Sequence, residues 1–171
     1  VYARRPASAA PLVAMGATAY DSPAALAQAV DVVITNVSDT PDVEAVLLGE
    51  HGVIHGAHAG LVAVDMSTIN PLAAKTIAAR LGAAGIAFLD APVSGGEVGA
   101  VAGTLTIMVG GEADALARVR PVLEAMGKTI THIGASGAGQ VAKACNQIVV
   151  AVSIAAVAEA MKFAWACEVN P

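Results

Sequence analysis

The sequence predicts a protein of the α/β class, with a doubly wound, mostly parallel sheet followed by the first long helix of an all-α domain. Up to Gly134, short apolar runs alternate with amphipathic stretches, as expected for strands covered by helices on both faces. After Gly134 the remaining residues have a helical pattern and no strand pattern. We therefore expect two domains, residues 1–135 and residues 136–171, with ligands at the carboxyl ends of the strands of the first domain.

Apolar runs and turn residues define the expected elements in chain order. They are a strand end at residues 1–2, helices at 7–15 and 22–30, strands at 31–37 and 60–67, a helix at 70–85, strands at 86–93 and 104–111, a helix at 112–126, a strand at 128–134 and a long helix from 137. Val1 and Tyr2 lead into a basic turn closed by Pro6, which indicates that a strand ends there. The first two complete strands are continuous β-rich runs, which is typical of parallel strands buried on both faces.

Capping residues and prolines mark the ends of the expected helices. Ser22 and Asn70 can each accept a hydrogen bond from the first turn, and each is followed by a proline at the first helical position. The first helix ends at Gly16. Pro121 lies near the middle of the fourth helix, where we expect a kink or a break.

Composition and charge exclude several classes of function. The chain has 171 residues and a formal net charge of −5, and its basic residues are scattered, so we reject a DNA or RNA partner. Cys145 and Cys167 are too far apart for a CxxC motif, and we interpret them as reduced cysteines of a cytoplasmic protein. The most apolar stretch, residues 148–158, is shorter than the roughly 20 residues of a membrane span, so we expect a soluble protein with no membrane partner.

One charged side chain, Lys143, stands in the small and apolar run GAGQVAKACNQIVV at residues 137–150. Burial of an unpaired lysine is costly, so such a residue calls for a compensating function. On a helix, Lys143, Asn146 and Gln147 share one face, because residues three and four apart are neighbours. This cluster fits a catalytic group, but a surface lysine solvated by two amides has the same pattern.

The start of this run, residues 137–142, also fits the G-x-G-x-x-A pattern of a dinucleotide-binding turn. Glu159 follows Gly139 at the distance expected for a ribose-binding acid. That acid should end a second strand, however, and Glu159 lies in continuing helical sequence. We therefore interpret the match as coincidental and do not assign the cofactor site to these residues.

Another polar motif follows a strand in the stretch DAPVSGG. Its residues Ser94, Gly95 and Gly96 offer a hydroxyl and closely approachable backbone N–H groups, which suit a carboxylate.

Three blocks in fixed order carry a resemblance to a known family. VDMSTINP at 64–71, FLDAPVSGGEVGAVAGTLTIMVGG at 88–111 and GAGQVAKACNQ at 137–147 resemble the β-hydroxyacid dehydrogenase family, which is 3-hydroxyisobutyrate dehydrogenase-like. The resemblance spans essentially the whole chain. It is greatest to the 2-hydroxy-3-oxopropionate (tartronate semialdehyde) reductases of that family.

The resemblance implies a Rossmann-like domain and a reversible hydride transfer between a nicotinamide and a short β-hydroxy acid or semialdehyde. Lys143 matches the family's catalytic lysine, a general acid and base. Asn146 and Gln147 match the polar pair that orients the substrate, although family members often carry asparagine at the second position. The three residues of the SGG motif would hold the substrate carboxylate, and no metal is required.

The resemblance also places a cofactor site. NAD-preferring members carry an acid at the end of the second strand of the family, where this chain lacks one and Arg4 and Arg5 follow. Because guanidinium pairs with phosphate in bidentate fashion, NADPH is favoured over NADH. Val37 and Ser38 match residues that approach the dinucleotide, and Thr68 matches one beside the nicotinamide. For Ser38, an ordinary polar residue at a strand end is nearly as good an interpretation.

The same resemblance predicts that the chain is the central part of a longer enzyme. The family's first strand and glycine-rich loop would precede Val1, and most of the helical domain would follow Pro171. We expect the full-length protein to be a homo-oligomer, and the chain alone to bind cofactor poorly and to be inactive.

Several activities remain open from the sequence. The alternatives within the family are 3-hydroxyisobutyrate dehydrogenation and reduction of glyoxylate or succinic semialdehyde. A catalytically silent reader module of the same fold is the alternative from another class. Such a module would have little need to retain both Lys143 and Ser94, so we favour an enzyme.

Two further clusters are interpreted as structural. His51, His55 and His58 have helical spacing for a metal site, but the glycines between them indicate a loop, and we reject a metal. Asp65 and Asp90 both end strands, and we assign them to local turn structure rather than to a catalytic carboxylate pair.

Overall fold

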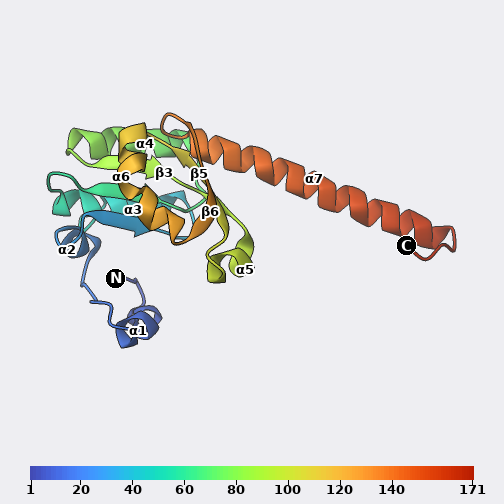
Figure 1. Cartoon of the computed structure of the whole chain (residues 1–171), viewed down its shortest axis with the longest axis horizontal. Coiled ribbons are helices and arrows are strands. Elements are labelled where there is room, and N and C mark those ends of the chain that lie inside the picture. Colours follow the sequence, from blue (N-terminus) through green and yellow to red (C-terminus); the bar gives the residue numbers. More distant parts are fainter.

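Three short apolar strands form the parallel part of the sheet. The computed structural model, which describes residues 1–171, contains β1 (Val32–Thr35), β2 (Val62–Asp65) and β3 (Ala87–Asp90), paired in parallel in that order. Their last residues are cross-strand partners, since Thr35 pairs with Asp65 and Asp65 pairs with Asp90. The carboxyl ends of the three strands therefore meet at one edge of the sheet (Figure 1).

The rest of the six-stranded sheet contains two strands that run opposite to the first three. β5 (Leu105–Gly110) runs antiparallel to β3 and β4 (Val93–Ser94) and parallel to β6 (Gly127–Gly134). One register runs along β3 and β4, because β5 pairs Gly110 with Asp90, Ile107 with Val93 and Thr106 with Ser94. The predicted strand at 86–93 is therefore present in two parts, separated at Pro92. Three of the strand pairs are parallel, and the prediction of a mostly parallel sheet is confirmed.

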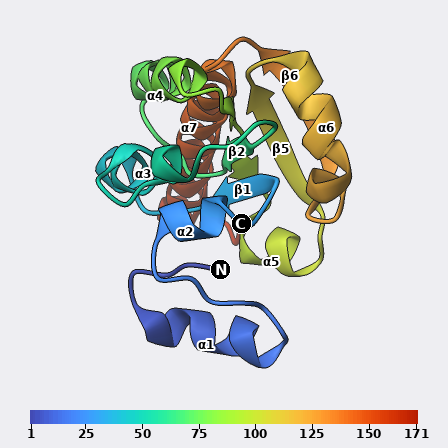
Figure 2. The same ribbon diagram turned by 90° about the vertical axis from the view of Figure 1, so that its left-hand side faces the viewer.

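Helices cover both faces of the sheet. α3 (Thr40–Leu48) and α4 (Pro71–Ala83) lie on one face, and α6 (Ala113–Glu124) lies on the other (Figure 2). Successive residues of β3 face opposite ways, because Phe88 belongs to the apolar cluster under α3 and α4, and Leu89 to the cluster under α6. This two-sided core confirms the doubly wound α/β fold.

Local capping follows the sequence at both predicted helix starts. The Ser22 hydroxyl oxygen accepts a hydrogen bond from the Ala25 N–H at 3.0 Å and starts α2 (Pro23–Ala27). The Asn70 side-chain oxygen accepts one from the Leu72 N–H at 2.8 Å and starts α4. α1 (Pro6–Ala14) ends just before Gly16, whose φ of +99° favours glycine.

The structure corrects the prediction in three places. Residues 1–3 form no strand, and Val1 instead forms backbone hydrogen bonds with Thr18 and Tyr20. α6 does not break at Pro121, which lies in its last turn, and continues to Glu124. The sequence patterns did not indicate three short helices, namely α3, the 3₁₀ helix η1 (Val53–Gly56) and α5 (Gly96–Val101).

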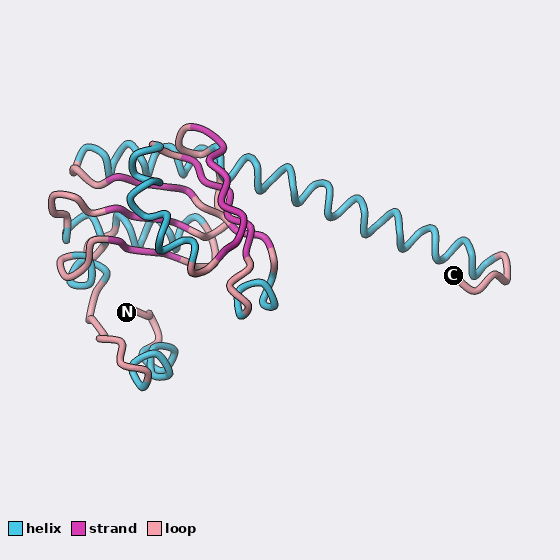
Figure 3. Tube along the Cα trace, in the orientation of Figure 1, coloured by secondary structure: helices cyan, strands magenta, loops and turns pink.

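The chain ends in one long helix, α7 (Ala138–Ala166), which extends away from the α/β body (Figures 1 and 3). Its start is buried against the body at Gly139 and Gln140, and nearly all of its residues beyond the first turns are exposed. By length and composition alone, α7 could cross a membrane. The expectation that no apolar segment is long enough for a span is therefore wrong, because the helix continues well beyond the apolar run at 148–158.

Candidate active site

Hydrogen bonds tie together the loops that follow β1 and β2. The buried carboxylate of Asp65 accepts a hydrogen bond from the Thr35 hydroxyl at 2.8 Å and one from the Ser67 N–H at 3.2 Å. The Ser67 hydroxyl in turn accepts a hydrogen bond from the Val37 N–H at 2.9 Å. Burial raises the pKa of Asp65, although the hydrogen bonds from Ser67 and Thr35 oppose that shift. Asp65 therefore serves the turn at this edge.

Asp90, at the end of β3, does more than shape a local turn. One of its carboxylate oxygens accepts a hydrogen bond from the Gly137 N–H at 2.6 Å, and the other accepts one from the Gln140 N–H at 3.0 Å. These donors are free N–H groups at the start of α7, which a carboxylate satisfies well. The assignment of Asp90 to local turn structure is thus too narrow, because the carboxylate caps a helix 47 residues later in the chain.

The G-x-G pattern at the start of α7 serves packing. Gly137 has a φ of +87° and already donates its N–H to Asp90. A Cβ at Gly139 would lie 2.6 Å from the Asp90 carbonyl oxygen and closer still to that of Met108. Gly139 thus allows the helix to approach β3 and β5, and Gly137 allows it to approach the start of α4. This turn leaves no room for a pyrophosphate, in agreement with the interpretation that it is not the cofactor site.

Sequence reasoning missed Gln140, which is 1% exposed. Its side-chain oxygen accepts a hydrogen bond from the Ile69 N–H at 3.0 Å, and its side-chain nitrogen donates one to the Ser67 carbonyl at 2.8 Å. These two contacts lie on either side of Thr68, so one side chain fixes this loop to the first turn of α7. The signal available in the sequence was a long polar residue between small ones at a helix start.

Lys143 lies three residues after Gln140 on α7 and is half-buried. Neither of the two ion pairs in the chain involves Lys143. Asn146 is half-buried and donates a hydrogen bond to the exposed Gln147 at 3.3 Å. The three predicted residues are within one helical turn of one another, as their spacing requires.

The SGG motif joins β4 to α5. Ser94 is half-buried, while Gly95 and Gly96 are exposed with φ values of +138° and +60°. Ser94 follows Asp90 by four residues, so their Cα atoms are separated by at most about 14 Å. Asp90 holds the start of α7, the helix that carries Lys143, so the motif lies within this distance of a residue that contacts the helix start.

Three of the residues predicted for the cofactor follow β1 and β2 at the same edge of the sheet. Ser38 and Thr68 are exposed after β1 and β2, and Val37 is half-buried with its N–H already bonded to Ser67. Arg4 and Arg5 are exposed beside the start of α1. Arg4 forms an ion pair at 3.3 Å with Asp42, in the first turn of α3, which is the helix that follows Ser38.

The histidines do not form a metal-binding cluster. His58 bonds through its two ring nitrogens to the carbonyl oxygens of Val30 and Ala59, and these backbone contacts raise its pKa, the one to Val30 most. No group of three His, Cys, Asp or Glu side chains in the chain is arranged to hold a metal ion.

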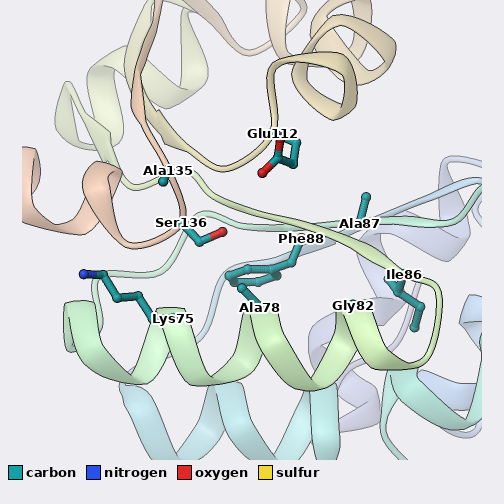
Figure 4. A pocket seen from close by; sticks show the side chains of 9 residues that line it. All are labelled: Lys75, Ala78, Gly82, Ile86, Ala87, Phe88, Glu112, Ala135 and Ser136. Carbon is teal, nitrogen blue, oxygen red and sulfur yellow. The ribbon is translucent and has the colours of Figure 1, made fainter.

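A cavity of about 480 Å³ opens between α4 and the segment that joins β6 to α7 (Figure 4). Lys75, Phe88, Glu112 and Ser136 are among its lining residues, and the Lys75 side chain lies at one end, toward the start of α7. None of the residues predicted for catalysis, substrate or cofactor lines this cavity.

Comparisons with known proteins agree with this arrangement. Residues 1–134 match the family described as the NAD-binding domain of 6-phosphogluconate dehydrogenase. Residues 137–171 match the family described as NAD-binding of NADP-dependent 3-hydroxyisobutyrate dehydrogenase. The first match covers more than half of the chain.

Individual relatives point the same way. The chain is 44% identical over 160 residues to 2-hydroxy-3-oxopropionate reductase of Escherichia coli, covering 94% of the chain and 55% of that protein. It is 48% identical over 150 residues to NAD-dependent L-serine dehydrogenase of Pseudomonas aeruginosa, covering 88% and 50%. The solved structure of Mycobacterium tuberculosis 3-hydroxyisobutyrate dehydrogenase with L-serine superposes with a TM-score of 0.91 at 40% identity, covering 99% of the chain and 57% of that structure.

The chain thus spans about half the length of the curated relatives it matches. The matched families, these relatives and the fold all identify the same group. The chain belongs to the β-hydroxyacid dehydrogenase family, with the NAD-binding domain typical of 3-hydroxyisobutyrate dehydrogenase-like proteins.

Proposed function

We propose that the protein carrying this chain is an NAD(P)-dependent β-hydroxyacid dehydrogenase or reductase, with Lys143 as general acid and base. The proposal depends above all on the position of Lys143. It is a half-buried ammonium without an ion-pair partner, three residues after a helix turn that is fastened to the carboxyl edge of the sheet. Ligands of open α/β sheets bind at this edge.

The reaction follows from the chemistry of these side chains. A bound nicotinamide supplies or accepts the hydride. In reduction, the Lys143 ammonium donates a hydrogen bond and then a proton to the carbonyl oxygen as the carbonyl carbon gains the hydride. In oxidation, the neutral amine takes the hydroxyl proton as that carbon loses the hydride. Asn146 and Gln147, on the same helix face, orient the substrate by hydrogen bonds.

The substrate we favour is 2-hydroxy-3-oxopropionate (tartronate semialdehyde), reduced to glycerate. Ser94, Gly95 and Gly96 would hold its carboxylate, because a hydroxyl and glycine N–H groups with positive φ can surround an anion. The name of the Escherichia coli relative supports this substrate. The second candidate is oxidation of a 3-hydroxy acid such as L-serine or 3-hydroxyisobutyrate, which the names of two other relatives support.

NADPH is the cofactor we favour. Arg4 and Arg5 provide two exposed guanidinium groups that fit a 2′-phosphate, and the hydroxyls of Ser38 and Thr68 fit polar parts of a dinucleotide. Asp42 already pairs with Arg4, but an exposed ion pair is weak and can exchange for a phosphate. The description of the family matched by residues 137–171 names an NADP-dependent enzyme and supports this preference.

The active assembly we propose is a homo-oligomer in the cytoplasm. The exposed apolar surface of α7 suits packing against further helices, and the family match of residues 137–171 supports this role over a membrane span. The proposed partner of the site is a small carboxylate substrate.

Oxidation or reduction of the nicotinamide cofactor by the full-length protein tests the proposal. We compare the wild type with Lys143→Ala. The substrates are tartronate semialdehyde, L-serine and 3-hydroxyisobutyrate, each with NADP(H) and with NAD(H). Lys162→Ala is the matched control, since Lys162 is an exposed lysine farther along α7. We expect turnover to fall about a hundredfold in Lys143→Ala, as for a lost general acid, and to stay unchanged in the control.

Two outcomes would contradict the proposal. Equal turnover by wild type and Lys143→Ala would remove Lys143 from the mechanism. A wild-type protein that binds NADPH but turns over none of these substrates would favour the catalytically silent module.

A further inference from the structure

Two side chains outside the proposed catalytic set fasten the start of α7 from different directions. Asp90 lies beyond the N-terminal end of α7, and its carboxylate accepts hydrogen bonds from the Gly137 and Gln140 N–H groups at 2.6 and 3.0 Å. Gln140 points sideways from the helix and bonds the backbone of residues 67 and 69 at 2.8 and 3.0 Å. We call this pair of side chains the α7 clamp.

The two contacts restrict different motions of the helix. A carboxylate at the helix end opposes sliding of α7 along its axis, because both oxygens are bound to first-turn N–H groups. A side chain bonded on one flank opposes rotation of α7, because rotation would carry Gln140 away from the loop. Together they fix the position and orientation of every residue in the next turn.

Lys143 is in that next turn. It follows Gln140 by three residues, which places it about 4.5 Å farther along the axis on the same side of the helix. The loop that Gln140 binds carries Thr68, whose side chain is exposed between the buried residues Ser67 and Ile69. The α7 clamp therefore sets Lys143 and Thr68 relative to each other, although neither of its side chains is adjacent to Lys143 in sequence.

We propose that Asp90 and Gln140 are positioning residues for the hydride transfer, which they serve by holding the Lys143 ammonium in line with the loop at the nicotinamide end. This inference rests on the proposed function of Lys143. A proton donor must lie within hydrogen-bonding reach of the oxygen it protonates, and a displacement of about 1 Å can lower the rate about a hundredfold. A loosened clamp would therefore slow the proton transfer without removing any group that contacts substrate or cofactor.

The test uses the variant Gln140→Leu of the full-length protein. Leucine is similar in size to glutamine but is apolar, so both hydrogen bonds are lost. We expect kcat to fall about ten- to a hundredfold, with the KM for NADPH unchanged. We also expect the solvent deuterium isotope effect on kcat to increase, because proton transfer becomes more strongly rate-limiting. Gln28→Leu, at an exposed glutamine that follows α2, is the matched control and should change none of these values.

The isotope effect separates positioning from a merely structural role. A variant that is only partly folded has less active enzyme, so its apparent kcat falls while its isotope effect stays at the wild-type value. That result, or an unchanged kcat in a folded Gln140→Leu, would overturn the inference. If Gln140→Leu does not fold, Gln140→Met gives the same comparison, because it keeps the length of the side chain and loses both hydrogen bonds.

The inference and the proposed function can fail separately. Full activity in Lys143→Ala would remove the proposed function and the positioning role with it. Loss of activity in Lys143→Ala together with wild-type kinetics in Gln140→Leu would leave the proposed function intact and overturn the positioning role alone.

Discussion

At the scale of single residues, Asp65 combines full burial with a carboxylate oxygen that has no hydrogen-bond partner. Burial raises its pKa above the ordinary value of 3.8, so the folded protein holds this proton more tightly than the unfolded chain does. Folding stability therefore falls as pH rises above 3.8 and through the raised pKa, and the penalty is constant at higher pH.

The variant Asp65→Asn should remove this dependence, because an amide does not titrate. We expect the unfolding free energy of the wild type, minus that of the variant, to decrease as pH rises from 3.8 through the raised pKa of Asp65. Urea denaturation of both proteins across this range measures the difference. A difference that is constant or that grows with pH would show that Asp65 does not carry the effect.

Single residues also show what the sequence can and cannot predict about the site. Lys143 was recognisable because a charge in an apolar helix has few explanations, and Ser94 because a polar residue before two glycines follows a strand. Gln140 and Asp90 were not recognisable as a pair. Their hydrogen bonds cross 50 residues of chain, and nothing in the local pattern indicates which helix start a strand-end carboxylate will cap.

At the scale of elements, the start of α7 packs closely against the sheet at Gly139, where a side chain would not fit. Gly139 lies in the first turn of α7 and Gly82 in the last turn of α4, and their surroundings differ. A Cβ at Gly139 would overlap backbone atoms of β3 and β5, whereas nothing lies within 4 Å of a Cβ at Gly82. The same substitution should therefore have opposite effects at the two positions.

Gly139→Ala should destabilise the protein by about 1–3 kcal/mol, because backbone atoms cannot move aside cheaply. Gly82→Ala should stabilise it by about 0.5–1 kcal/mol, since alanine loses less entropy in a helix. Thermal and urea unfolding of both variants check the signs. Equal effects would mean that glycine at Gly139 serves helix flexibility and not close packing.

Elements were predictable where the local chemistry decides them. The caps at Ser22 and Asn70 and the continuous strands follow from side chains within a few residues. α3 also starts with a local signal, because Asp39 is its cap and Pro41 lies in its first turn, but the same polar residues fit a loop after a strand. The break of the strand at Pro92 and the reversal of β5 depend on pairing between distant segments, which a single sequence does not specify.

At the scale of the whole molecule, the α/β body and the exposed part of α7 are largely independent. The hydrogen bonds and close packing that attach α7 to the body all lie at its first turn, at Gly137, Gly139 and Gln140. The rest of the helix exposes large apolar side chains such as Ile148, Ile154, Phe163 and Trp165. An apolar surface of this extent drives association.

Removal of residues 149–171 should leave the body folded with the same unfolding midpoint and should reduce self-association of the chain. Circular dichroism melts and sedimentation velocity of chains 1–148 and 1–171 at several concentrations measure both properties. A large fall in the midpoint would mean that the outer helix stabilises the body. Equal self-association of the two chains would mean that residues 149–171 do not form the association surface.

The carboxylate cap on α7 also has a consequence for the order of folding. An isolated helix start leaves its first N–H groups without partners, and here the partner arrives from β3, far earlier in the chain. Asp90 can occupy that position once β3 is in place beside β2 and β5. The first turn of α7 should consequently gain its protection from hydrogen exchange together with the central strands, so that formation of the sheet controls when the lysine-bearing helix becomes fixed.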